Sequence, residues 1–337
     1  MRNVTKALFG AAGAVAAAAV AEKAAARRLR QRVDPELDPL FRVPDDVVHH
    51  RIATADGATL HAIERGEGRP LVLLHGVTLA AAIWSPQLRQ LTGEPGRPGF
   101  RVIACDLRGH GESTAGTDGW GLPVLARDLA TVLRELDLHD AIVAGHSMGG
   151  MTLMQFCADE AEALHERVAG VAFVATAAHS PLHPRVLDRA KVLGAKAIDR
   201  LDEGRPYPQL KLGGDLSLLV CRVAFGKEPT AAAVAQVRDC VEAMDPESFQ
   251  RSWIGLLDHD VRETLSHVGI PADIVVGSRD LLTPVSAART IAKLLPDAEF
   301  HLLPGCGHQV MQERPAELGR ILRSLAARIE APTARTA

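Results

Sequence analysis

Short apolar runs of strand length recur along this chain, and several of the segments between them show helical periodicity. Residues 47–54 and 59–64 flank the turn-forming pair Asp56-Gly57, so they predict an antiparallel hairpin. Most of the later runs are nearly continuous in apolar residues, which is typical of strands buried on both faces of a sheet. These later runs are residues 70–75, 102–105, 141–144, 168–175, 272–276 and 299–303.

Helical patterns alternate with these strands. Apolar side chains recur at helical spacing in residues 122–136, 148–164, 285–295 and 315–329. Repeated strand-helix units joined by short connections imply a mostly parallel sheet with helices on both faces. The pattern therefore predicts an α/β protein with an eight-stranded, mostly parallel sheet.

The connection after the sixth strand, residues 177–269, is far longer than an ordinary loop. Open α/β sheets bind ligands at the carboxyl ends of their strands, so we expect these residues to form a mobile helical cap over that edge. Helical periodicity recurs in this insertion around residues 185–201, 216–223 and 231–243.

The N-terminal segment, residues 1–32, contains an uncharged alanine-rich run over residues 7–21, flanked by basic residues. A signal peptide, a membrane anchor and a helix lying on the protein surface are all compatible with this pattern. The run is shorter than the roughly 20 residues that a bilayer core requires. Basic residues between 23 and 32 favour membrane association on the cytoplasmic side, with export and a free cytoplasmic protein as alternatives.

These patterns divide the chain into six parts. The expected divisions are 1–32 as anchor or signal, 33–46 as a linker, 47–176 as the first part of the core, 177–269 as the helical cap, 270–330 as the second part of the core, and 331–337 as a disordered tail.

Charge and cysteine content exclude several classes of protein. A formal net charge of −3 gives no basic field for nucleic acid, so no nucleic-acid partner is expected. The five cysteines include no C-x-x-C pair, which argues against a disulfide framework or a zinc site, although a Cys221–Cys240 bridge stays open. His179 and His183 are four residues apart but have no evident third ligand, so we expect no metal and no cofactor. The oligomeric state is not indicated.

The segment Gly145-His146-Ser147-Met148-Gly149 matches the G-x-S-x-G nucleophile elbow. It follows an apolar run of strand type and precedes a helical pattern, which is the context that this motif requires. Glycines two residues before and after the serine allow a close backbone approach that a Cβ atom would block. Ser147 is therefore a candidate nucleophile.

A serine hydroxyl needs a base that removes its proton, and two late loops supply the residues for this. Asp280 follows the strand at 272–276, and His308 follows the strand at 299–303. All three residues come after parallel strands, so they are expected at the same edge of the sheet. Their order along the chain, Ser, Asp, His, is the order expected with this elbow.

With these motifs the chain resembles the α/β-hydrolase superfamily, in its cap-bearing serine esterase and lipase-like branch. The likeness covers residues 47–329. The segments that carry it are His75-Gly76 with Trp84 downstream, residues 106–113, the elbow, the Asp280 loop and Gly307-His308.

The resemblance implies a role for each of these residues. Ser147 would be the nucleophile, His308 the general base and later acid, and Asp280 the group that orients the imidazole. The backbone N–H groups of Met148 and Val77 would form the oxyanion hole. The implied substrate is a small molecule with an apolar acyl group.

The resemblance leaves several activities open. Ester or related acyl hydrolysis is the first hypothesis, and a cofactor-free haloperoxidase, a perhydrolase and a carbon–carbon bond hydrolase are alternatives on the same fold. A non-enzymatic small-ligand receptor is an alternative of another class.

Other polar and aromatic residues have more ordinary interpretations. His75, His110 and His146 are expected to be structural hydrogen-bonding groups, and Asp106 with Arg108 is expected to form an ion pair that stabilises a turn. Four apolar cap residues are candidates for the lining of an acyl pocket, namely Phe225, Met244, Phe249 and Trp253.

Overall fold

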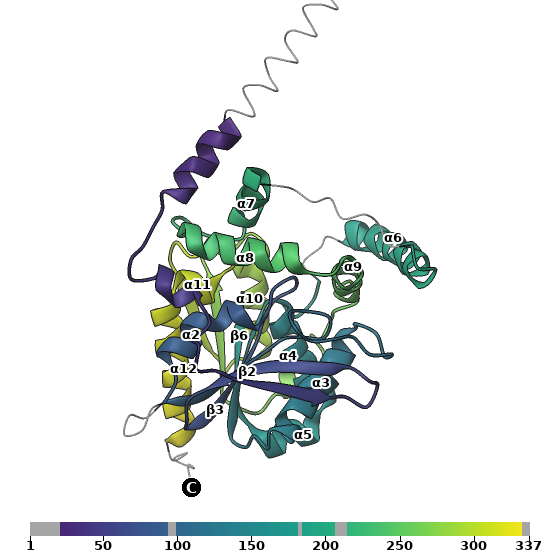
Figure 1. Ribbon diagram of the computed structural model, residues 1–337. Coiled ribbons are helices and arrows are strands. Elements are labelled where there is room, and N and C mark those ends of the chain that lie inside the picture. Colours follow the sequence, from purple (N-terminus) through teal and green to yellow (C-terminus); the bar gives the residue numbers. More distant parts are fainter. Residues whose placement is uncertain (1–20, 94–98, 181–183, 206–213, 332–337) are drawn as a thin grey trace, which may run out of the picture.

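The computed structural model describes residues 21–93, 99–180, 184–205 and 214–331. One eight-stranded sheet forms its centre, with the strand order β1-β2-β4-β3-β5-β6-β7-β8 (Figure 1). The strands are β1 (Val48–Ala53), β2 (Thr59–Arg65), β3 (Arg69–Leu74), β4 (Phe100–Cys105), β5 (Ala141–His146), β6 (Val168–Val174), β7 (Ala272–Gly277) and β8 (Glu299–Leu303).

The pairing of the strands confirms the expected mixed sheet. β1 pairs antiparallel with β2, with Ala53 opposite Thr59 across the predicted Asp56-Gly57 turn. β2 pairs antiparallel with β4, and every later pair in the sheet is parallel. The parallel strands bring the residues that follow β3, β5, β6, β7 and β8 to one edge of the sheet.

Helices lie on both faces and after β6. The α-helices are α2 (Ser85–Gln90), α3 (Leu122–Glu135), α4 (Met148–Asp159), α5 (Ala161–Arg167), α6 (Pro184–Asp202), α7 (Gly214–Arg222), α8 (Ala231–Ala243), α9 (Pro246–Gly255), α10 (Val285–Leu294), α11 (Val310–Glu313) and α12 (Pro315–Glu330). Three short 3-10 helices are η1 (Asp38–Phe41), η2 (Ala81–Trp84) and η3 (Leu265–His267).

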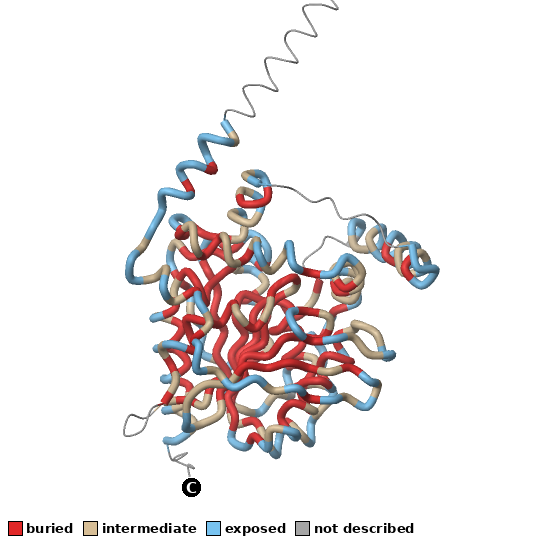
Figure 2. Tube along the Cα trace, viewed as in Figure 1, coloured by how far each residue is buried: buried red, intermediate tan, exposed pale blue. Residues whose placement is uncertain are grey.

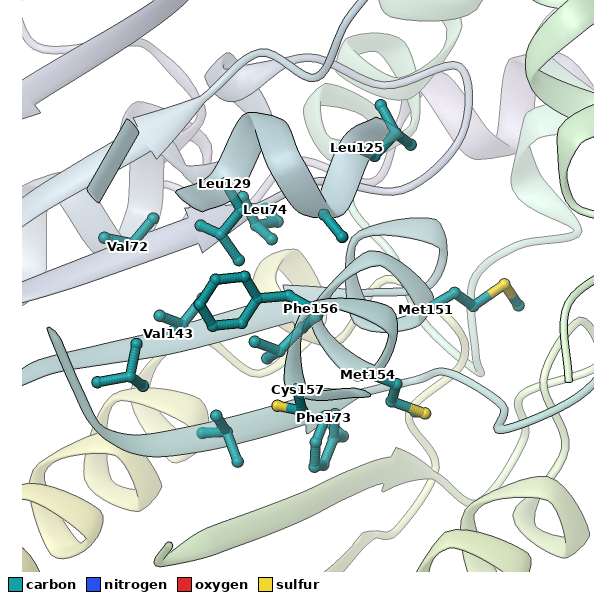
Figure 3. Close-up of a cluster of buried hydrophobic side chains, with 14 of the residues drawn as sticks. Val72, Leu74, Leu125, Leu129, Val143, Met151, Met154, Phe156, Cys157 and Phe173 are labelled. Carbon is teal, nitrogen blue, oxygen red and sulfur yellow. The ribbon is translucent and has the colours of Figure 1, made fainter. Parts of the chain in front are cut away.

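Two apolar clusters on opposite faces hold the sheet between the helices. One cluster contains residues of α3, α4 and α10, and the other contains residues of α2, α8 and α12. In the first cluster Phe156 of α4 is fully buried and lies between Val143 of β5 and Leu129 of α3 (Figure 3). The strands at the centre are the most continuously buried part of the chain, as Figure 2 shows. This burial explains why their sequences are apolar on both faces.

The helix that was predicted over residues 148–164 is two helices. Glu160 has the non-helical dihedral angles φ −112° and ψ 50° and separates α4 from α5. Its N–H still donates to the carbonyl of Phe156, so the backbone changes direction without losing that hydrogen bond. Apolar periodicity does not detect a turn of one residue.

Helices α6 to α9 form the cap after β6, and its position confirms the predicted insertion (Figure 1). Periodicity located α6, α7 and α8 but missed α9. The N-terminus of α9 carries a local signal, because Asp245 precedes Pro246 and its side chain accepts the N–H of Ser248 at 2.9 Å.

The N-terminal part lies against the cap. Residues 21–30 are helical, and within this helix Ala26 and Leu29 are buried. The carbonyl of Arg32 accepts the N–H of Ala231 of α8, and Gln236 of α8 donates to the carbonyl of Phe41. Most of the alanine-rich run falls outside the described residues. In the part of the chain that the structure describes, every helix is too short or too polar to cross a membrane.

Candidate active site

Ser147 lies at the sharp turn between β5 and α4. Its φ of 52° is in the left-handed region, which is strained for a residue with a side chain. A Cβ atom on Gly145 would lie 2.3 Å from the carbonyl oxygen of Gly149, and one on Gly149 would lie 2.5 Å from that of Leu74. Both motif glycines are therefore required by the close backbone contacts of the turn.

Hydrogen bonds from β6 hold the backbone of Ser147 in this conformation. The N–H of Ser147 donates to the carbonyl of Val174 at 3.0 Å, and the hydroxyl of Thr176 donates to the carbonyl of Ser147 at 2.7 Å. Both Ser147 and Thr176 are buried. Thr176 was not predicted as a site residue. Its position directly after the strand next to β5 was the available signal.

His308 and Asp280 meet at the same edge of the sheet. Nδ1 of His308 lies 2.9 Å from Oδ2 of Asp280, and both side chains are almost fully buried. Thr283 donates its hydroxyl to the same Oδ2 at 2.8 Å, and its oxygen lies 3.2 Å from Nδ1 of His308. Thr283 is a second residue that the sequence did not identify.

The second oxygen of Asp280 is held by backbone groups. Oδ1 accepts the N–H groups of Leu282 and Thr283, each at 2.9 Å. Burial by itself would raise the pKa of Asp280, but the adjacent His308 and the hydrogen bonds from His308 and Thr283 outweigh it and lower that pKa. Asp280 is therefore ionised at neutral pH and acts only as an acceptor, so Nδ1 of His308 carries the proton between them.

A buried glutamate supports the loop of His308. Glu313 accepts the N–H of Gly307 at 2.9 Å and the N–H of Gly226, which precedes α8, at 2.8 Å. The N–H of His308 itself donates to the carbonyl of Ala224 at 2.8 Å. The conformation of the His308 loop thus depends on the chain segment that joins α7 to α8. Glu313 was also missed by sequence reasoning.

His146 connects the elbow to His308. Its Nε2 donates to the carbonyl of His308 at 3.0 Å, and the two rings lie 4.6 Å apart. Burial, followed by the proximity of His308, holds the pKa of His146 well below its usual range, so its ring is neutral. Among the described residues no hydrogen bond joins the Ser147 hydroxyl to His308, a contact that often forms only with substrate bound.

The predicted oxyanion donors flank Ser147. Met148 is the first residue of α4, where a backbone N–H has no partner within the helix and the helix dipole favours an anion. Val77 follows Gly76, and a Cβ atom on Gly76 would lie 3.1 Å from Cβ of Ser147. The loop after β3 thus packs directly against the elbow.

The prediction of an ion pair between Asp106 and Arg108 is wrong. Arg108 pairs with Asp128 at 2.8 Å and with Asp56, so it joins α3 to the β1–β2 turn. Asp106 instead accepts from Nδ1 of His61 at 2.7 Å. Residues two apart in this turn point in different directions, and spacing alone did not show this.

Three further histidines, His75, His110 and His179, make structural hydrogen bonds. His75 donates from Nδ1 to the carbonyl of Gly76, and its Nε2 accepts the N–H of Leu107 at 3.0 Å. His110 donates to the carbonyl of Arg108. His179 bonds the carbonyl of Ser180, while His183 lies outside the described residues.

The four residues proposed to line an acyl pocket differ in their exposure to solvent. Phe225 and Met244 are buried, whereas Trp253 of α9 is 45% exposed and its ring lies 6.4 Å from that of Phe249.

All five cysteines are free thiols.

Comparison with known proteins identifies the fold and its relatives. A family model described as alpha/beta hydrolase fold matches residues 69–315. An AB hydrolase superfamily protein of Bacillus subtilis, YisY, is 26% identical over 81% of this chain and 97% of its own length. The non-heme chloroperoxidase CPO-A1 of Kitasatospora aureofaciens is 29% identical over 76% of this chain and 91% of its own.

A solved structure supports the same fold. The esterase EaEST of Exiguobacterium antarcticum superposes with a TM-score of 0.69 at 20% identity, over 83% of this chain and 100% of the esterase. With the sheet order, the cap after β6 and the family match over most of the chain, this protein belongs to the alpha/beta hydrolase fold family.

Proposed function

We propose that the protein is a serine hydrolase that cleaves a carboxylic ester or a related acyl bond. The observation that carries this proposal is the buried hydrogen bond between His308 and Asp280 at the sheet edge where the elbow presents Ser147. Esterases among the structural neighbours support the proposal through the fold.

In the proposed reaction Ser147 attacks the substrate carbonyl while Nε2 of His308 removes the proton of its hydroxyl. The N–H groups of Met148 and Val77 stabilise the negative oxygen of the tetrahedral intermediate. His308 then protonates the leaving group, which leaves an acyl group on Ser147. Water, activated by the same imidazole, releases the acid product, and Asp280 stabilises the imidazolium in both steps.

A peroxide-dependent activity is a second candidate, because several relatives are named as non-heme haloperoxidases. In this alternative, hydrogen peroxide rather than water would attack the acyl-enzyme and release a peracid. Turnover of an acyl donor with and without hydrogen peroxide, with the two products measured separately, distinguishes the two activities. If the acid remains the main product when hydrogen peroxide is present, hydrolysis is supported. If the peracid becomes the main product, the peroxide-dependent activity is supported.

Covalent labelling tests the proposed nucleophile. A fluorophosphonate probe should add its mass to Ser147, and Ser147→Ala should lose labelling and about 10³- to 10⁶-fold in kcat. Ser286→Ala, which changes an exposed serine on α10, is the matched control and should keep both. Labelling that persists in Ser147→Ala would exclude this serine, and labelling without turnover of any ester would favour the ligand receptor.

We also propose that the N-terminal segment, residues 1–32, determines location, on the cytoplasmic side of a membrane, rather than catalysis. The structure indicates where to shorten the chain, because Leu29 is buried and Arg30 pairs with Asp215 of α7. A chain that begins at Ala21 keeps these contacts and should keep its esterase rate. Full-length protein should sediment with membranes and the shortened protein should not; equal sedimentation of the two would contradict the proposal.

A further inference from the structure

A second cluster of ligand-type side chains lies away from Ser147, at the β1–β2 edge of the sheet. It consists of His49 on β1, His61 on β2 and Glu112 in the loop after β4, and their nearest ligand atoms all lie within 4.8 Å of one another. Nδ1 of His49 and Nε2 of His61 are only 2.9 Å apart. None of these residues takes part in the proposed hydrolysis.

The buried partner of His61 sets the tautomer of its neutral ring. Nδ1 of His61 lies 2.7 Å from Oδ2 of Asp106, and both side chains are 4% exposed. An ionised carboxylate can only accept, so the proton of a neutral His61 is on Nδ1. Nε2 of His61 therefore directs its lone pair toward Nδ1 of His49, which donates to it in this structure and would have to give up its proton to a metal ion. A carboxylate behind an imidazole is the arrangement that orients histidine ligands in metal sites.

We propose that His49, His61 and Glu112 bind a divalent first-row transition metal ion of the Zn²⁺ type. Two imidazole nitrogens and one carboxylate form a ligand set that zinc favours, with a fourth position for water. Metal–ligand distances of 2.0–2.1 Å place tetrahedral ligands about 3.4 Å apart. The 2.9 Å separation of the two imidazoles is near this value, and the exposed side chain of Glu112 can move to complete the site.

The surroundings leave room for the ion. A pocket of about 460 Å³ is lined by His49, His61, Asp106 and Glu112, together with apolar residues that include Ala80–Ala82. Arg51 is the nearby cation, and it pairs with Glu112 through one of the carboxylate oxygens. Asp45 and the buried Asp106 also line this pocket and supply negative charge, which favours a cation there.

Another cluster of acidic and histidine side chains, on β7 and β8, is not suited to bind a metal ion. Asp273, Glu299 and His301 are equally close to one another. In that cluster Arg328 donates to Asp273 and to Glu299, each at 2.9 Å, so a guanidinium already lies between the carboxylates. Of the two clusters found in the described part of the chain, we therefore assign the cation site to the His49 cluster.

Zinc titration of the chelator-treated full-length protein, in competition with a chromophoric chelator, tests the proposal. We expect one Zn²⁺ per chain and an at least tenfold weaker affinity in His49→Ala and in Glu112→Gln. His50→Ala is the matched control, because the neighbouring strand residue points to the opposite face and bonds Glu64 instead. Its zinc affinity should stay within about twofold of that of the unmodified protein.

Thermal unfolding gives an independent measurement. Bound zinc should raise the Tm of the unmodified protein and of His50→Ala, but not that of His49→Ala, and Mg²⁺ should raise none of them. Equal zinc affinity of the unmodified protein and His49→Ala would overturn the proposal and leave a hydrogen bond between two imidazoles. An equal response to Mg²⁺ would also overturn it, since binding would then be nonspecific.

Discussion

Among the described residues two histidine–carboxylate pairs are buried, and only one of them lies at the elbow that carries Ser147. In both pairs an aspartate after a strand end binds Nδ1 of a histidine, at 2.9 Å for Asp280–His308 and 2.7 Å for Asp106–His61. Both aspartates also accept backbone N–H groups, Asp280 from Leu282 and Thr283, and Asp106 from Ala81 and Glu112.

The two pairs differ in what lies next to Nε2, the imidazole nitrogen that does not bond the aspartate. His308 lies beside the elbow of Ser147, whereas Nε2 of His61 faces His49. The same type of carboxylate–imidazole hydrogen bond would thus support proton transfer at His308 and metal binding at His61. A histidine–carboxylate pair by itself does not define a catalytic site.

Removing each carboxylate should separate the two roles most clearly. Asp280→Asn should lower kcat for ester hydrolysis by about 10⁴-fold, because the amide no longer stabilises the imidazolium or its tautomer. Asp106→Asn should instead lower the free energy of unfolding by about 1–3 kcal/mol, because its amide nitrogen would face N–H groups of His61 and Glu112. Steady-state kinetics and chemical unfolding of both variants provide the comparison.

Two outcomes would contradict this separation. One is a loss of kcat in folded Asp106→Asn as large as that in Asp280→Asn. The other is an Asp280→Asn protein that unfolds more easily but keeps its rate.

The histidines that flank each pair should make the protein sensitive to acid. Burial is the main cause that lowers the pKa values of His75 and His110 near Asp106, and of His146 near His308; the pKa of His110 falls to about 3. Between about 6.5 and 3 the unfolded chain therefore binds protons that the folded protein does not. The contribution of these histidines to the free energy of unfolding should be fully present above about pH 6.5 and should decrease as the pH falls through this range.

Replacing one of these histidines measures its share. At pH values below about 6, His110→Gln should reduce the slope of unfolding free energy against pH by about 1.4 kcal/mol per pH unit. His165→Gln, at an exposed position on α5, is the control and should leave the slope unchanged. An unchanged slope in His110→Gln would mean that His110 is protonated in the folded protein.

The smallest expected effect concerns the threonine that supports only the Asp280 pair. Thr283→Val removes the hydroxyl that donates to Asp280 at 2.8 Å, and we expect a three- to tenfold lower kcat, equivalent to about 1 kcal/mol. Thr283→Ser keeps the hydroxyl and should recover most of the rate. A lower rate in Thr283→Ser than in Thr283→Val would show that the methyl group, rather than the hydrogen bond, matters at this position.

The sequence predicted the sheet, the position of the cap and the elbow because these depend on local pattern. Apolar runs mark buried strands, and Gly145 and Gly149 mark a backbone contact that tolerates no side chain. Thr283 was missed because no motif marked its hydroxyl, and Thr176 and Glu313 were missed because they bond Ser147 and Gly226, which are distant from them in sequence. The partners of Asp106 escaped for the same reason, since His61 is distant from it in sequence.

The crossing of Gly226 and Gly307 limits how this protein could exchange its cap for another. A Cβ atom on Gly307 would lie 2.3 Å from the backbone nitrogen of Gly226, and one on Gly226 would lie 2.1 Å from the carbonyl oxygen of Gly305. Glu313 accepts an N–H from each of these two segments. A foreign cap grafted at its ends would therefore have to reproduce this crossing, and we expect working chimeras only when residues 224–226 stay with the recipient. One short segment of the cap region, residues 224–226, is thus also a fixed support of the loop that carries His308.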